Sequence, residues 1–297
     1  MSSPNSPSPR MAGLMTSNRR DPWTRGNYTE EELVRAFLDG KVAGPVTSHD
    51  RQNVRGKIEL LVAGDPKLQF GISGLSGYSA AEVLALVAEE AGFEPDPELA
   101  GPTAIDPWRV LKACQMAGDR LAAAADRGER VIVATGHPAG LPVLYIAVAN
   151  LLEQAGAKLL RPLQGFRWEA ESWRRKRHRQ VRYLFGVAVL TDRGSTIHTH
   201  SAEPMQRMLE EARPDLVFAD HGFAGAAIEA GIDTISIVDV NDPAPVVAKA
   251  QGRTQLVIVM DDNVEPDDYW PCFQAIASRF PSGAAAKWTR GEGPPLG

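Results

Sequence analysis

The sequence predicts an α/β fold: a mainly parallel, Rossmann-like three-layer sheet that follows a mostly helical N-terminal portion. Two observations support this prediction. Before residue 128, apolar residues recur at helical spacing, whereas after it short β-branched runs alternate with helical segments. Such alternation is typical of βαβ units, in which helices cover both faces of a parallel sheet. We therefore expect a helical region at 27–127 and an α/β domain at 128–280 that carries the active site.

The helical region is predicted to begin at Thr29, whose side chain can cap a helix with three glutamates in its first turn. Leu33, Phe37 and Leu38 fall on one face of that helix. Helical spacing returns at 53–63, 79–91 and 106–127. The glycine-rich stretch 71–77 matches neither a dinucleotide-binding nor a phosphate-binding loop, so it is predicted to be a turn without a part in catalysis.

In the second half, β-branched and apolar runs predict the strands, and amphipathic segments predict the helices between them. The predicted strands are 131–135, 158–162, 183–190, 216–219, 234–238 and 256–260. The predicted helices are 141–154, 203–212, 222–230 and 243–251. The two ends, 1–26 and 281–297, are rich in Ser, Pro and Gly and are predicted to be a disordered N-terminal tail and a flexible C-terminal tail.

Composition limits the class of protein. A formal net charge of −5 gives no general attraction to nucleic acid or to an anionic membrane. Cys114 and Cys272 are too far apart in sequence for a metal clamp or a disulfide framework, which suits a reducing compartment. The N-terminal stretch has no apolar run that would make a signal peptide or anchor. We therefore expect a cytoplasmic protein with a small-molecule partner, no membrane partner and no nucleic acid, and we leave open whether it forms homo-oligomers.

Polar residues follow four of the predicted strands directly. The segments are 136–140 after the first strand, then Asp220-His221, Asp239 to Asp242, and Asp261-Asp262. Since ligands of open parallel sheets bind beyond the carboxyl ends of the strands, these residues can converge although they are distant in sequence. The competing interpretation, solvated loop aspartates, explains any one of them but explains four together less well.

His198-Thr199-His200 adds imidazoles to these carboxylates. Residues two apart in an extended segment project to the same side, so both rings can face one metal ion or one phosphate. Mixed carboxylate and imidazole ligands suit zinc or another divalent transition metal, whereas carboxylates alone would suit magnesium. We therefore expect a divalent metal (Mg, Mn or Zn) and no organic cofactor. His49 and His178 are interpreted as incidental.

Two further segments could hold an anion. Gly136 lets the backbone approach a phosphate, and a helix beginning near Ala139 would present free N–H groups to it. Gly222 offers a similar cradle. The alternatives are a tight strand-to-helix turn at Gly136 and simple relief of crowding at Gly222. The basic run at 174–182 is predicted to be a solvated flap, with binding of a polyanion or an anionic substrate as the alternative.

The strings TGHPAGL (135–141), HTHS (198–201), DHG (220–222), DVNDPA (239–244) and MDDNV (260–264) occur in an order that resembles a bacterial family labelled "phosphatase". The likeness covers most of the chain, more weakly at 43–47 and 101–108. It implies a phosphatase of small metabolites. Better-known phosphatase patterns are absent: Cys272 and Arg279 are one residue too far apart for the cysteine phosphatase loop, and no DxDx(T/V) motif opens the first strand.

On this basis the sequence predicts hydrolysis of a phosphomonoester of a small polar metabolite, assisted by a metal. The predicted catalytic residues are His137, His198, His200, Asp220 and His221. Predicted substrate-binding residues are Thr135, Gly136, Ser201, Gly222 and Asn241. Predicted metal ligands are Asp220, His221, Asp239, Asp242, Asp261 and Asp262. Two alternatives remain open: a lyase, isomerase or cyclase acting on a carboxylate or sugar acid, and a non-catalytic nucleotide- or metabolite-binding regulatory module.

Overall fold

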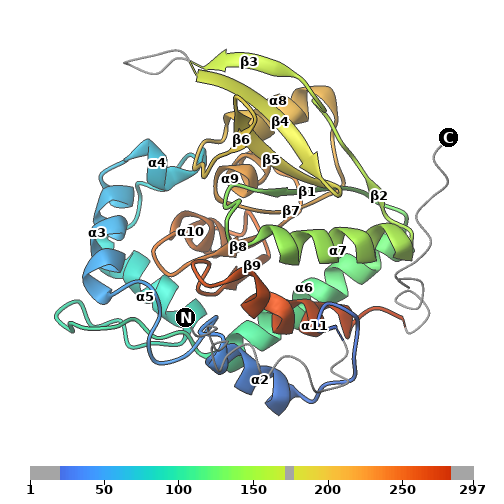
Figure 1. Ribbon diagram of the computed structural model, residues 1–297. Coiled ribbons are helices and arrows are strands. Elements are labelled where there is room, and N and C mark those ends of the chain that lie inside the picture. Colours follow the sequence, from blue (N-terminus) through green and yellow to red (C-terminus); the bar gives the residue numbers. More distant parts are fainter. Residues whose placement is uncertain (1–20, 171–176, 282–297) are drawn as a thin grey trace, which may run out of the picture.

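The computed structural model describes residues 21–170 and 177–281, and it confirms the predicted α/β class (Figure 1). A single sheet runs in the order β3-β4-β5-β1-β7-β8-β9, with β2 paired to β1 and β6 paired to β5. From β5 through β1, β7 and β8 to β9, each strand is parallel to the next, and β2 is parallel to β1. The parallel strands are β1 (Arg130–Thr135), β2 (Lys158–Leu159), β5 (Val187–Asp192), β7 (Leu216–Asp220), β8 (Thr234–Val238) and β9 (Leu256–Val259).

Helices cover both faces of this sheet. On one face, α6 (Pro107–Asp126), α7 (Pro142–Ala155) and α11 (Trp270–Ala277) pack against each other, with α6 on β9 and α7 on β1. On the other face, α9 (His221–Glu229) packs on β7 and β8 and is itself covered by α8 (Glu203–Glu211). The strands alternate accordingly: Val131 and Val133 join the first core, whereas Ile132 and Ala134 join the second.

The N-terminal helices are α2 (Glu30–Asp39), α3 (Arg51–Val62), α4 (Pro66–Gln69) and α5 (Ala80–Ala91). They pack at the β9 end, where α5 contacts α10 (Ala244–Ala250) and α2 contacts α6 and α11 (Figure 1). Local sequence fixes where they begin: Thr29 and Glu32 form a capping box, as do Ser79 and Glu82. Asp106 caps α6 just before Pro107. The helix starts predicted near 29, 79 and 106 are therefore confirmed, whereas α3, capped by Asp50, begins two residues before the predicted 53.

The predicted strand 183–190 is wrong as a single element. It spans the end of β4 (Arg177–Leu184), a turn at Phe185 and Gly186, and the start of β5, which runs antiparallel to β4. Phe185 and Gly186 both have positive φ (46° and 94°), which reverses the chain within an otherwise apolar run. The described part of the basic run, 177–182, is therefore a strand rather than a flap, while 174–176 lie outside the described residues.

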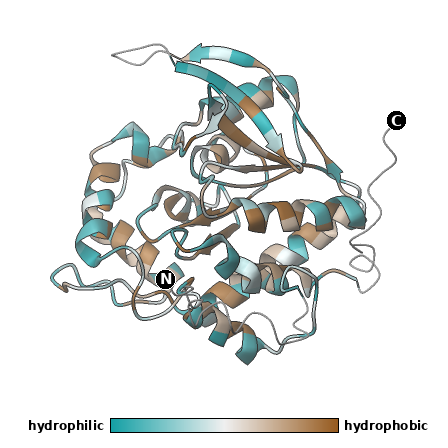
Figure 2. Cartoon of the chain, in the orientation of Figure 1, coloured by the Kyte–Doolittle hydropathy of each residue, from teal (hydrophilic) through white to brown (hydrophobic). Residues whose placement is uncertain are grey.

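Strand β4 also pairs with the edge strand β3 (Arg167–Ala170), and this hairpin is visibly more hydrophilic than the central strands (Figure 2). Three short elements had no sequence signal: α4, β6 (Ser195–Thr196) and the 3-10 turn η1 (Pro266–Tyr269). Helix α11 was also not predicted. Residues 21–26, which were expected in the N-terminal tail, lie against α11, where Gln274 Nε2 donates to the carbonyls of Pro22 and Thr24.

The other predicted tail residues, 1–20 and 282–297, lie outside the described part of the chain. Within the described part, no helix combines the length and the apolar character needed to cross a membrane.

Candidate active site

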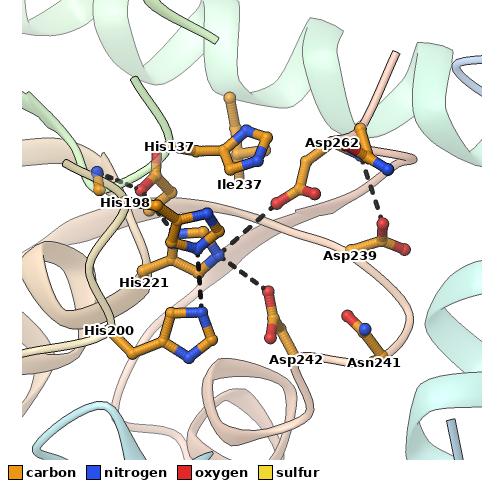
Figure 3. Close-up of polar contacts among 12 residues, drawn as sticks. His137, His198, His200, His221, Ile237, Asp239, Asn241, Asp242 and Asp262 are labelled. Atoms are coloured by element: carbon orange, nitrogen blue, oxygen red, sulfur yellow. Dashed lines mark hydrogen bonds and ion pairs between the residues drawn. The ribbon is translucent and has the colours of Figure 1, made fainter. Parts of the chain in front are cut away.

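The parallel strands deliver their polar residues to one edge of the sheet. Strands β1, β7, β8 and β9 end next to one another, and the loops after them carry His137, His221, Asp242 and Asp262 (Figure 3). The segment after β6 joins them because Thr199 N–H donates to Gly136 O (2.9 Å). A Cβ on Gly136 would lie 2.4 Å from Thr199 O, so only glycine allows this approach. Tertiary pairing therefore gathers the residues that the sequence separates.

His221 stands at the centre of the cluster. Its ring stacks with those of His198 (centroids 4.9 Å apart) and His200 (4.6 Å). Its Nε2 lies 3.1 Å from Asp242 Oδ2 and 3.6 Å from Asp262 Oδ2. It begins α9 with φ of +44°, a left-handed conformation that is strained for a residue with a Cβ. Such strain at a strand-to-helix junction is characteristic of functional sites, because the surrounding structure must hold it in place.

Asp220 fixes the position of this junction. Its carboxylate accepts from Thr135 Oγ1 (2.5 Å) and from Gly136 N–H (2.6 Å), which ties the end of β7 to the end of β1. Its Oδ1 also lies 3.2 Å from His221 Nδ1, although the ring N–H is not aligned for a hydrogen bond. In this pair His221 faces the cluster, while Asp220 holds the backbone behind it.

The ligand atoms form two overlapping groups. His198, His200 and His221 offer ring nitrogens within 4.8 Å of one another, and His221, Asp242 and Asp262 do the same with one nitrogen and two oxygens. Nε2 of His198 and Nε2 of His200 lie 3.0 Å apart, so the two nitrogens face one shared position. Such convergence, with imidazole and carboxylate donors together, fits a divalent transition metal or zinc.

The histidines of the cluster differ in the direction of their pKa shifts. Burial, followed by the charge of His221, lowers the pKa of His198 to about 4 and also lowers the pKa of His200. Burial lowers the pKa of His137 as well, against the opposing effect of Asp220. Burial also opposes the charged form of His221, but Asp220 and Asp242 outweigh it and raise the pKa of His221 well above the usual histidine value. The cluster therefore contains one charged imidazole surrounded by neutral ones.

The aspartates of the cluster also fall into two groups, one with lowered and one with raised pKa values. Burial opposes ionisation of Asp220 and Asp242, yet His221 beside them lowers the pKa of each. Burial raises the pKa of Asp239 well above normal and that of Asp262 to about 7, and neighbouring carboxylates add to both shifts. Five aspartates, counting Asp261, are at most 6% exposed around one charged histidine. This excess of buried negative charge would be relieved by a bound cation.

Asp239 and Asp261 lie at the outer side of the cluster and bind the N-terminal region. Asp261 accepts from Ser48 N–H (2.6 Å) and from Ser48 Oγ (2.8 Å). Asp239 Oδ2 lies 3.5 Å from His49 Nε2, so the interpretation of His49 as incidental is wrong. No local pattern could have indicated this contact, because it depends on how the segment before α3 folds over β8 and β9. His178 lies apart, exposed on β4.

The residues predicted to bind substrate are placed differently from one another. Thr135 Oγ1 and Gly136 N–H both donate to Asp220, which leaves neither group directed at open space. Gly222 sits where a Cβ would lie 2.2 Å from Ser201 O, so it allows α9 to pack against that segment. Asn241 donates to Asn53 Oδ1 (3.0 Å), another contact with the N-terminal region.

Two aromatic residues that were not predicted as site residues, Phe70 and Tyr145, lie next to the cluster. Phe70, which has φ of +53° just after α4, packs edge-on against His200 (centroids 5.0 Å apart) and His221 (5.5 Å). Tyr145 of α7 is fully buried, and burial together with Asp220 raises the pKa of its hydroxyl. These rings exclude water from one side of the cluster, while the exposed His198 leaves the other side open.

Comparison with known proteins agrees with this site. The model of a family described as "Phosphatase" matches residues 28–282, which include every candidate residue named above. Phosphatase SCO2771 of Streptomyces coelicolor is 37% identical over 248 residues, covering 81% of this chain and 90% of that protein. No solved structure matches the chain. Because the family match spans most of the sequence and the relative is similar along nearly its whole length, the chain belongs to this Phosphatase family.

Proposed function

We propose that this chain hydrolyses phosphomonoesters of small polar metabolites with the help of a divalent metal. The observation that carries the proposal is the convergence of His198, His200, Asp242 and Asp262 on His221, from loops far apart in sequence. Membership of the Phosphatase family supports the class of reaction. In this reaction water adds to phosphorus, the bond from phosphorus to the ester oxygen breaks, and a proton passes to the alkoxide that leaves.

The donors present fit a metal. His198, His200, His221, Asp242 and Asp262 would hold it, and the mixture of nitrogen and oxygen donors favours zinc or manganese over magnesium. When bound, a divalent cation supplies positive charge to the phosphoryl oxygens and makes a nearby water molecule more acidic. Asp239 and Asp261, predicted as ligands, are proposed instead to hold the acidic loops against Ser48 and His49.

The roles of the chain's own residues follow from their contacts. Asp220 orients His221 and joins β7 to β1, so we assign it a positioning role. His198 and His200 were predicted to be catalytic residues, but their lowered pKa values keep them neutral at neutral pH, which suits metal ligands better than acids. The pKa of His137 is lowered as well, so we assign it the exchange of a proton with the leaving oxygen on position alone: it lies beside the cluster and belongs to neither group of candidate metal ligands.

The proposal can be tested on the purified protein. Bound metal is quantified by mass spectrometry, and phosphate release is measured from a panel of metabolite phosphomonoesters before and after chelation. We expect turnover that chelation abolishes and that zinc or manganese restores. His198→Ala should behave like the chelated protein, whereas the matched control His178→Ala, which changes an exposed histidine on β4, should behave like the wild type.

Three results would contradict the proposal. Full turnover in metal-free protein would remove the metal from the reaction. Tight binding of a nucleotide without phosphate release from any ester would favour the regulatory module, and conversion of a sugar acid would favour the lyase or isomerase alternative.

A further inference from the structure

A pocket of about 490 Å³ opens beside the cluster and shares His137 with it. Its walls come from the end of α2, the loop between β1 and α7, and the loop that leads into η1. Its lining includes Asp39, Lys41, His137, Gly140, Glu265 and Asp268. This volume is within the range of pockets that bind small molecules.

His137 marks the boundary between this pocket and the candidate metal ligands. One side of its ring meets His198 edge-on (centroids 4.8 Å apart) and lies 5.8 Å from the ring of His221 (Figure 3). The side chain is buried (7% exposed), yet Nδ1 has no hydrogen-bond partner among the described residues. Since buried polar atoms are nearly always paired, this nitrogen indicates an atom of a ligand as the missing partner.

Gly140 lies directly beside that nitrogen. A Cβ at this position would lie 3.2 Å from His137 Nδ1 and 3.0 Å from Asp262 O. Gly140 lines the pocket together with His137, so a side chain there would press on the imidazole and narrow the pocket. Glycine at this position therefore keeps the pocket wall beside His137 free of a side chain.

The charge of the lining restricts what that molecule can be. Asp39, Glu265 and Asp268 contribute three carboxylates and Lys41 one ammonium group. Across residues 21–170 and 177–281 no ion pair neutralises any of the four. The lining therefore has an excess of negative charge. Carboxylates accept hydrogen bonds from hydroxyl groups and pair with ammonium groups, but they repel a further phosphate or carboxylate.

We propose that this pocket holds the leaving group of the substrate, and that this group is a polyol or an amino alcohol with no negative charge other than that of the phosphate to be cleaved. The assignment rests on the proposed function, since it places the scissile phosphate at the histidine and aspartate cluster. His137 then lies at the junction between the two parts. Sugar bisphosphates and phosphorylated carboxylic acids are poor substrates for electrostatic reasons.

The test compares two pairs of phosphate esters, each matched in carbon number: glucosamine 6-phosphate against fructose 1,6-bisphosphate, and glycerol 1-phosphate against 3-phosphoglycerate. In each pair the first compound has no negative charge beyond one phosphate, and the wild type is expected to prefer it in kcat/KM. Glu265→Lys reverses one exposed charge of the lining and should change that preference by about three- to tenfold toward the second compound of each pair, as expected for a partly screened charge. The change should occur mainly in KM and should shrink at high salt.

Glu210→Lys is the matched control, because it makes the same change of charge on the exposed surface of α8. It should leave the preference as in the wild type. Equal shifts in both variants, or an unchanged preference in Glu265→Lys, would overturn the assignment of the pocket.

Calorimetric titration of the metal-loaded protein with the same four compounds separates this inference from the proposed function. If no compound releases phosphate, the proposed function is wrong. The pocket is then still tested by binding: preference for the amino sugar and its loss in Glu265→Lys support it, and indifference to charge refutes it.

Discussion

The two ends of strands β1 and β7 carry charges in opposite arrangements. At the amino end, Arg130 binds Asp215 through its backbone N–H (2.9 Å) and through two guanidinium nitrogens (3.0 and 2.7 Å). Nearby, Arg120 bridges Glu129 (2.8 Å) and Asp233 (2.7 Å). At the carboxyl end, Asp220 and the aspartates of neighbouring loops are buried around a single charged histidine.

This difference separates stability from function within one pair of strands. At the amino end each carboxylate has an arginine partner and access to water, so the charges cost little to place and hold strands and helices together. At the carboxyl end like charges are crowded away from water, which costs stability unless a cation binds. We expect substitutions at the carboxyl end to remove activity and those at the amino end to remove stability.

The largest effect is expected at Asp242. Asp242→Asn keeps the size of the side chain but removes one charge that faces His221 Nε2. Metal occupancy should fall and kcat should drop by about 100-fold or more, as for loss of a ligand, while the free energy of unfolding of the metal-free protein stays within about 1 kcal/mol. Asp126→Asn, at the exposed end of α6, is the control. Full activity in Asp242→Asn would exclude this carboxylate from the site.

Asp220→Asn should have the next largest effect. Its carboxylate raises the pKa of His221, so the amide should lower that pKa, which NMR of the metal-free protein can follow. We expect kcat to fall by about 10- to 100-fold, in the range measured for residues that orient metal ligands. A purely structural role would instead lower the melting temperature and leave the pKa of His221 unchanged.

At the amino end, Arg120→Ala should reduce stability without touching the chemistry. The substitution leaves Glu129, whose side chain is 15% exposed, without its Arg120 partner. The free energy of unfolding should fall by about 1–3 kcal/mol, measured by urea denaturation, with kcat unchanged. Arg127→Ala removes a more exposed partner of the same glutamate and should cost less than about 1 kcal/mol. Loss of activity in Arg120→Ala would show that the amino end of the strands also contributes to activity, which contradicts the comparison of the two ends.

The smallest effect concerns pH. Hydrogen bonds from Arg130 lower the pKa of Asp215 from 3.8 to about 2. Because the folded pKa lies below the unfolded value, the pair stabilises the fold above pH 3.8, and the contribution is lost as the pH falls through about 2. Asp215→Asn should therefore have a slightly lower urea midpoint than the wild type at pH 5, and the difference should shrink toward pH 2.5. A difference that grows on acidification would reverse the sign of the linkage.

Prediction from sequence was most accurate where the cause is local. Thr29, Ser79 and Asp106 cap their helices through bonds within three residues, and the parallel strands follow from short β-branched runs. It was least accurate at β4 and β5, where one apolar run contains the turn at Phe185. A hydrophobic pattern reports burial but not the point at which the chain reverses.

The sequence by itself determined the α/β class, most of the helices and strands, and the polar segments that follow the strands, because these depend on spacing and on contacts within a few residues. Tertiary structure alone decided which polar residues meet. It placed Ser48 and His49 beside Asp261 and Asp239, turned Thr135 and Gly136 toward Asp220, and left His137 at the edge of an acidic pocket. The physical reason is that pKa values and ligand groups depend on distance and burial, which strand order sets and sequence separation does not.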